Sequence, residues 1–273
     1  MFTPVMRSSR WLLAIAGMLI PSLLVAAERK LPTFKKGDYN SEHASVEMFE
    51  GIKSGQLDVK IIVKSSKEAN LFIENKTKEP LNVKLPDAFT AVLAQAGFGA
   101  DPFGGGGAGG GGQAQAVGGG AGGMGGMGGG GQNFFNVPAE RVGEVNVPCV
   151  CLEHGKDEPR PSMKYQIQPF EAYSDNGALR EVLTALGKGQ LSQRVAQVSA
   201  WHLASGMSWD QLATKEVRRL NGVRYPYFHP QEVAAAMRVV QLATEMAKQQ
   251  PQPQPVKVEG QTLSDSNKVS QND

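Results

Sequence analysis

A long glycine-rich run interrupts this chain and constrains its fold more than any other feature. Residues 97–133 are nearly all Gly, with some Ala, Gln and Met, and no charged residue occurs between Pro102 and Ala139. Such a segment has too little apolar surface to offset the conformational entropy lost on ordering. We therefore expect residues 97–133 to be a disordered insertion. Because loop-closure entropy grows only slowly with length, the flanking segments can still form one domain.

The first 27 residues have the three parts of a secretory signal peptide. Arg7 and Arg10 form a basic start, residues 11–27 carry no charge, and Val-Ala-Ala at 25–27 provides small residues before Glu28. This order predicts cleavage after residue 27. An uncleaved membrane anchor is the alternative. We therefore expect an exported protein, either periplasmic, attached to the cell envelope or secreted.

Charge and motif content narrow the function further. Arg7 and Arg10 account for the whole formal net charge of +2, so the exported chain is formally neutral. Binding to nucleic acid requires a cationic face, and neutrality argues against such a partner. No stretch after the leader approaches the ~20 apolar residues of a membrane span. The sequence also lacks a GxSxG elbow, an HExxH helix, a P-loop and a dinucleotide fingerprint. We therefore expect a non-enzymatic protein without a cofactor, whose partner is a protein or glycan at the cell surface.

Alternating patterns predict β-structure on both sides of the glycine-rich run. After an extended lead-in at 28–44, residues 45–96 contain a short helical stretch and strand patterns at 56–63, 71–74 and 81–85. The Asn- and Pro-containing residues 75–80 predict a turn, which would make 71–74 and 81–85 a hairpin. Residues 134–170 supply further strands. Together these strands predict a small β-sandwich.

Helical periodicity replaces the alternation from residue 171 to residue 248. Apolar spacing predicts a helix near 178–186 with Asp175 as its cap, and Ser192 begins a second one that Gly206 ends. A capping-box pattern at Ser208 begins a third helix, ending near 221–222, and Pro230 begins a fourth. Residues 249–273 are expected to be a disordered tail. The predicted fold class is therefore α+β, a β-rich half followed by a helical region.

Two cysteines stand two residues apart at the end of a predicted strand. Cys149 and Cys151 would face the same way with Cα atoms about 6.5–7 Å apart, which is at or beyond the limit for an unstrained disulfide. Adding His154 gives a candidate metal site, although zinc sites more often show CxxC spacing. Ordinary packing of two small side chains is the alternative.

The segment around Cys151 also suggests a covalent role. Val150-Cys151-Leu152-Glu153 precedes the helix near 178–186 and a helix with the sequence Ala-Gln-Val-Ser-Ala-Trp at 196–201. Over residues 137–205 this order resembles the thioester domains of bacterial surface adhesins. The resemblance implies a crosslink between Cys151 and Gln197, with Trp201 as the packing residue after the glutamine. In such a reaction the Cys thiolate attacks the Gln carboxamide and ammonia leaves.

A second resemblance concerns the β-rich segments. Asn75-Lys76-Thr77, Pro80-Leu81 and Val137-Pro138-Ala139 are similar to segments of uncharacterised exported bacterial proteins that begin with a β-sandwich. This resemblance implies the same fold class and no particular activity.

Three aromatic residues cluster between the third and fourth predicted helices. Tyr225, Tyr227 and Phe228 lie within six residues of the chain. Such a segment either folds back onto the helical core or exposes an aromatic patch for a partner or glycan. Both alternatives remain open from sequence.

Overall fold

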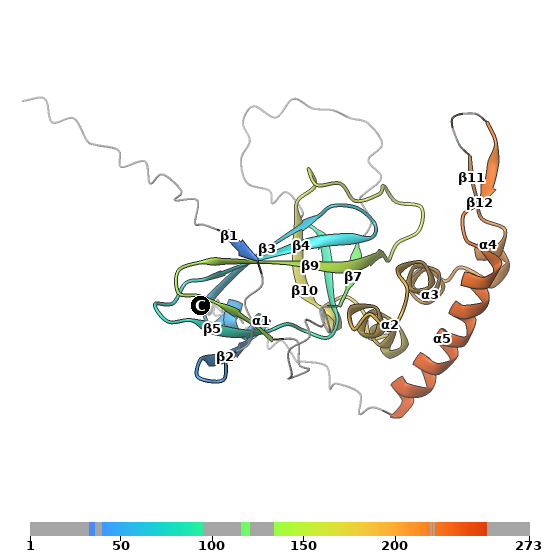
Figure 1. Cartoon of the computed structure of the whole chain (residues 1–273). Coiled ribbons are helices and arrows are strands. Elements are labelled where there is room, and N and C mark those ends of the chain that lie inside the picture. The colour runs from blue at the N-terminus through green and yellow to red at the C-terminus, as the bar shows by residue number, and fades with distance from the viewer. Residues whose placement is uncertain are drawn as a thin grey trace, which may run out of the picture. The chain divides into compact units, whose positions relative to one another are not determined.

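The computed structural model describes residues 33–35, 40–94, 116–120, 134–218, 220 and 222–249, which all belong to one compact unit, Leu31–Asp273 (Figure 1). The predicted signal peptide, most of the lead-in and the tail beyond residue 249 lie outside these residues. Most of the glycine-rich run lies outside them as well.

Six antiparallel strands close into a barrel. Their order is β9-β4-β3-β10-β6-β7, and β7 pairs with β9 again, which completes the circle. The bounds are β3 Leu57–Val63, β4 Glu68–Asn75, β6 Phe89–Leu93, β7 Val117–Gly119, β9 Val142–Cys151 and β10 Tyr165–Pro169. Strand β1 (Thr33–Lys35) adds to β9 in parallel, and a 3-10 turn, η1 (Phe170–Ala172), follows β10.

A second, three-stranded sheet shares the core of the barrel. It has the order β2-β5-β8, with bounds Ala44–Glu47, Leu81–Lys84 and Phe134–Val137. The short helix α1 (Met48–Lys53) directly follows β2. Val83 and Phe135 of this sheet are fully buried in the same cluster as Leu71 of the barrel. The α+β class is confirmed. The predicted β-sandwich is not, because the pairing of the main sheet is that of a closed barrel.

The predicted hairpin between 71–74 and 81–85 is wrong, because its two strands belong to different sheets. Strand β4 pairs with β3 and β9, whereas β5 pairs with β2 and β8. The buried Asn75 side chain directs the chain from one sheet to the other. Its Nδ2 donates to the carbonyl oxygens of Glu79 (2.8 Å) and Val137 (3.0 Å), and its Oδ1 accepts from the N–H of Thr77 (2.9 Å). A polar side chain thereby satisfies the backbone where the two sheets separate.

The prediction of disorder for the whole of residues 97–133 is also wrong, because β7 lies within this run and is buried. The single larger side chain of β7, Val117, is fully buried in the barrel core. A Cβ added at Gly118 would come within 2.9 Å of Leu183, and one at Gly119 would come within 2.9 Å of Phe89. The glycine-rich composition of the run did not predict this strand. The strand is stabilised by backbone pairing with strands on both edges and by the close packing that glycine allows.

In the described chain, four helices follow the barrel (Figure 1). They are α2 (Gly177–Gly187), α3 (Gln193–Ser205), α4 (Trp209–Ala213) and α5 (Pro230–Gln249). Helices α2 and α3 pack against the barrel, and α5 packs on the far side of these two helices (Figure 1). Leu152 and Val150 of the strand segment share a buried cluster with Leu183 of α2 and Ala200 of α3. Over the described residues, no helix combines the length and the apolar content needed to cross a membrane.

Most of the predicted helix ends agree with the structure. Ser192 caps α3 and Ser208 forms a capping box with Gln211, whereas the cap of α2 is Asn176 in place of the predicted Asp175. The third helix ends at Ala213 and does not continue to 221–222. The chain instead forms a hairpin of β11 (Glu216–Arg218) and β12 (Arg224–Pro226), which extends away from the helices (Figure 1).

Candidate functional site

Helix α3 covers the last residues of β9 with polar side chains. Strand β4 accompanies β9 only as far as Pro148, so the edge beyond it has no neighbouring strand on that side. The Nε2 of Gln193 donates to the carbonyl oxygen of Cys149 at 3.3 Å. Twelve residues along the sequence of α3, the hydroxyl of Ser205 donates to the carbonyl oxygen of Leu152 at 2.8 Å. Side chains of α3 therefore make the hydrogen bonds to the backbone of this edge that a neighbouring strand would otherwise make.

The central contact of this edge joins Gln197 to Cys151. Gln197 Oε1 accepts from the Cys151 N–H at 2.9 Å, and Gln197 Nε2 donates to the Cys151 carbonyl oxygen at 2.8 Å. Both residues are buried, with 5 % and 1 % of their surfaces exposed. The structure thus brings together the two residues of the predicted crosslink. The contacts it shows engage the carboxamide with the backbone of Cys151.

Both cysteine thiols are free and buried. Burial raises the pKa of Cys151 to about 12 and raises that of Cys149 well above its ordinary value. The thiolate, not the thiol, is the nucleophile and the metal ligand. At neutral pH these thiols are therefore protonated and unreactive as nucleophiles or metal ligands.

The structure does not arrange the predicted metal ligands into a site. Within the described part of the chain, no group of three or more His, Cys, Asp or Glu side chains could hold a metal ion, and Cys149, Cys151 and His154 form no such group. His154 Nε2 instead lies 2.8 Å from Lys215 Nζ. Burial, and then the nearby Lys215, lower the pKa of His154, which favours a neutral ring facing the ammonium group.

Trp201, one helical turn after Gln197 in α3, is the centre of an aromatic cluster. It is 4 % exposed, and its ring lies 5.5 Å from that of Tyr227 and 5.7 Å from that of Phe228. The Lys215 ammonium lies 5.4 Å from the centre of the Trp201 ring and 5.2 Å from that of Tyr227. Cation–π attraction therefore adds to the packing at this point.

The predicted aromatic patch is divided between core and surface. Phe228 is buried, Tyr227 is half-buried, and Tyr225 is 42 % exposed. Arg194 of α3 holds the segment in place, because it forms two hydrogen bonds with Glu232, at 2.6 and 2.9 Å, and donates a third to the Tyr227 carbonyl oxygen. Tyr227 and Phe228 thus anchor the end of the hairpin to the helices, and Tyr225 is exposed to solvent on the hairpin.

We call the hairpin Glu216–Pro226 the arm. Large apolar side chains are exposed along it: Val217 by 40 %, Val223 by 46 %, and Leu220 completely. Across the two strands Val217 lies opposite Tyr225, whereas Arg218 lies opposite Arg224. The arm therefore presents an apolar pair and a basic pair at successive positions of one ribbon.

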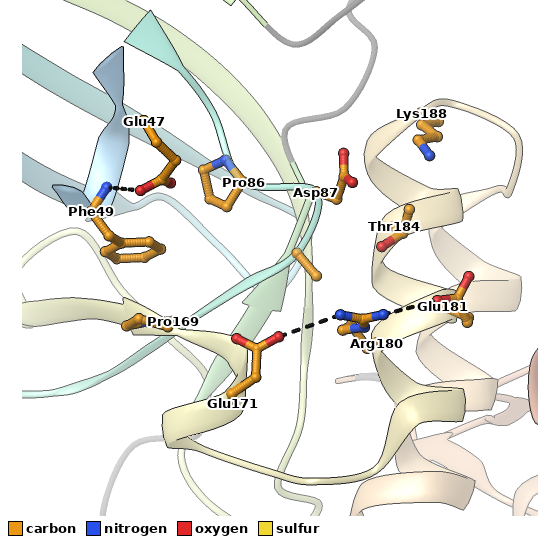
Figure 2. A pocket seen from close by; sticks show the side chains of 11 residues that line it. Glu47, Phe49, Pro86, Asp87, Pro169, Glu171, Arg180, Glu181, Thr184 and Lys188 are labelled. Carbon is orange, nitrogen blue, oxygen red and sulfur yellow. Dashed lines mark hydrogen bonds and ion pairs between the residues drawn. The ribbon is translucent and has the colours of Figure 1, made fainter. Parts of the chain in front are cut away.

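A cavity of about 530 Å³ lies between α2 and the strand ends (Figure 2). Arg180 reaches Glu171 at 3.5 Å and Glu181 at 3.8 Å, and the Glu47 carboxylate caps α1 by accepting from the N–H of Phe49. These charged groups are engaged with one another or with the backbone. Binding sites usually combine an apolar lining with a few converging polar groups, so this cavity is a weaker candidate than the arm.

Sequence reasoning missed the arm and the two cations at its base, Lys215 and Arg194. The expected third helix extended over residues 214–222 and hid the strand pattern. One signal was available, because Asn-Gly at 221–222 is the strongest short hairpin signal as well as a common helix end. No local signal marks Lys215 or Arg194, because their partners lie far away in sequence.

No family model matches this chain, and comparisons with curated proteins and with solved structures found no match either.

Proposed function

We propose that this chain is an exported, non-enzymatic interaction protein of the cell envelope, and that its arm attaches it to an anionic lipid surface. The carrying observation is the concentration of exposed apolar side chains on a basic hairpin. The arm supplies Val217, Leu220, Val223 and Tyr225, while the other large exposed apolar residues in the described chain, Met237, Leu242 and Met246, are all on α5. Exposed apolar side chains gathered in one place mark interaction sites.

The charges of the arm favour a negatively charged partner. Arg218 and Arg224 lie directly opposite each other, and like charges in this position destabilise a strand pair. Glu216 offsets this only in part, since its carboxylate lies 3.4 Å from Arg224 and contacts no other arm cation in the structure's described residues. The sequence adds a further arginine at position 219. An anionic surface would relieve the repulsion.

The order of side chains along the arm favours lipid over an acidic protein. Leu220 at the turn is completely exposed, the Arg218 and Arg224 pair comes next, and Tyr225 follows behind it. This sequence matches the layers of a membrane surface, which are hydrocarbon, phosphate, and the interfacial region that tyrosine prefers. Each basic residue near an anionic surface contributes about 1 kcal/mol, so the attachment should be reversible and sensitive to salt.

Co-sedimentation with lipid vesicles tests this proposal. The full chain should sediment with vesicles containing phosphatidylglycerol, and not with vesicles of phosphatidylcholine alone. Leu220→Asp and the pair Arg218→Glu with Arg224→Glu should each abolish sedimentation. Leu242→Asp and Arg238→Glu change the same residue types on exposed positions of α5 and should have no effect.

Two outcomes would overturn the lipid partner. One is equal sedimentation with both vesicle types. The other is no sedimentation with either type while a poly-glutamate peptide binds the arm, which would indicate an acidic protein partner.

A thioester adhesin is the second proposal, and the contact between Gln197 and Cys151 favours it. The thioester ranks second because both ends of the Gln197 carboxamide already pair with the Cys151 backbone and the raised pKa of Cys151 keeps its thiol protonated, which favours a non-covalent contact. The intact mass of the protein separates the two.

A further inference from the structure

We infer that β7 is an exchangeable strand, so that the gap between β6 and β9 can be closed by residues 116–120 of the same chain or of a second copy. Reciprocal exchange would join two copies through their barrels. This inference concerns the barrel and is independent of the arm and its partner.

The gap requires an occupant. Val117 pairs with Ala91 of β6 and with Cys151 of β9, so β7 supplies partners to two strand edges at once. Its backbone also covers Phe89 and Leu183, which would contact any Cβ at Gly119 or Gly118. Without a strand here, two unpaired edges and buried apolar side chains would face water.

Only a glycine-rich strand fits the gap. A Cβ at Gly118 would lie 2.9 Å from Leu183, and one at Gly119 would lie 2.9 Å from the carbonyl oxygen of Pro148. At Gly120 a Cβ would meet two carbonyl oxygens, of Leu183 at 2.4 Å and of Asp87 at 2.7 Å. Backbone atoms cannot move aside as a flexible side chain can. The chain itself carries the required Ala-Val-Gly-Gly-Gly sequence at 116–120, which makes a second copy the fitting partner.

The anchoring of β7 is slight for a strand that closes a barrel. It has three residues and one side chain larger than alanine, Val117. The Thr90 hydroxyl, opposite Gly118, is buried and has no hydrogen-bond partner among the described residues, so the packing at this position leaves one polar group unsatisfied. Segments with so few buried side chains open locally at a low cost in free energy, which would allow β7 to leave the barrel.

Chain length allows the exchange. Residues 94–116 and 120–133 connect β7 to β6 and β8. Fully extended, the shorter connection could span at most about 45 Å. Exchange of an identical element between protomers is a common route to dimers.

A disulfide can report which chain supplies the strand. Val117 and Cys151 form a pair without mutual hydrogen bonds, because Leu152 N–H donates to the Ala116 carbonyl oxygen at the next position. Such pairs have Cα atoms about 4.5 Å apart, within the range for disulfides. A cysteine at position 117 should therefore crosslink to Cys151 of whichever barrel it occupies.

The experiment mixes two full-length chains. The donor carries Val117→Cys, Cys149→Ala and Cys151→Ala, and the acceptor carries Cys149→Ala alone and is labelled with ¹⁵N. The chains are unfolded, refolded together at high concentration and oxidised with glutathione disulfide, which accepts the two electrons of the new bond. Mass spectrometry then measures heterodimers with the 117–151 linkage. The control donor carries Lys78→Cys, at an exposed position, in place of Val117→Cys.

Strand exchange predicts about tenfold more linked heterodimer from the Val117→Cys donor than from the control, because a positioned thiol has a far higher effective concentration. Adding Gly118→Val to the donor should remove the excess. Equal yields from donor and control would overturn the inference. If the donor does not refold, the unmodified chain provides the test. After refolding at high concentration it should form dimers, and a synthetic peptide of residues 113–120 should prevent their formation. A chain that stays monomeric refutes exchange.

Discussion

Gln197 forms two hydrogen bonds with the backbone of Cys151, one at its N–H and one at its carbonyl oxygen. This is the pairing that an adjacent strand residue would make, supplied here by a side chain from a helix. The contact lies where β9 has lost β4 as a neighbour, and Leu152 N–H on the other edge is satisfied by Ala116 of the β7 segment. The two edges of the same strand segment are thus completed by a glutamine and by a glycine-rich strand.

Replacing Gln197 with leucine should destabilise the fold by about 2 kcal/mol or more. The variant keeps the side-chain volume but leaves a buried N–H and a buried carbonyl of Cys151 without partners, at about 1–3 kcal/mol each. Urea denaturation measures the change. The same substitution at the exposed Gln241 of α5 is the matched control. Equal midpoints for the two variants would contradict the role of Gln197.

The purified protein should have its full calculated mass, with no loss of ammonia. Both ends of the Gln197 carboxamide are engaged in hydrogen bonds, and the Cys151 thiol is protonated at neutral pH. Intact-mass spectrometry and thiol titration after unfolding check this, and two titratable thiols are expected. A mass lower by one ammonia that returns to the full value in Cys151→Ala would establish the thioester.

Stability should fall as the pH rises above about 9. The pKa of Cys151 is raised from its ordinary 9.0 to about 12 by burial, and that of Cys149 is raised as well. A raised thiol pKa means that the folded chain keeps a proton that the unfolded chain releases. Its contribution is therefore complete below pH 9 and is lost between about 9 and 12, by at most about 1.4 kcal/mol per pH unit and thiol.

Urea midpoints measured across this pH range for the parent chain and for a variant with Cys149→Ala and Cys151→Ala would test the pH effect. The double variant should show a flatter decline. Some decline should persist in it, because burial also raises the pKa of Tyr165 to about 12. Parallel curves for the two proteins would rule out the thiols as the cause.

Replacing Arg194 with alanine should loosen the base of the arm. Arg194 connects α3 to Glu232 of α5 and to the backbone of Tyr227, directly after the arm. Limited trypsin digestion should then cleave at Arg218 and Arg224 several-fold faster, because local opening governs such cleavage. Arg238→Ala, at an exposed position of α5, is the control. If both variants are cleaved at the same rate, Arg194 does not hold the arm.

Sequence patterns predicted the structure correctly where the interactions that determine it lie within the same short segment. Ser192 and Ser208 cap helices because their side chains reach backbone N–H groups within three residues. The strands at 57–63 and 142–151 follow from alternation along the segment itself. The same reasoning failed for the hairpin at 71–85, because the partners of β4 and β5 are determined by Asn75 and by distant strands.

By itself, the sequence determined the mixed α+β class and the caps of α3 and α4. It also indicated Cys151 and Gln197 as two residues that interact. Tertiary structure decided how they meet, because a carboxamide can bond to a thiol or to a backbone, and only the position of α3 against the edge of β9 selects the backbone. It also decided that Val117–Gly119 is a strand. One valine and two glycines have too little β-propensity to predict a strand, and their order comes from pairing with the edges of β6 and β9.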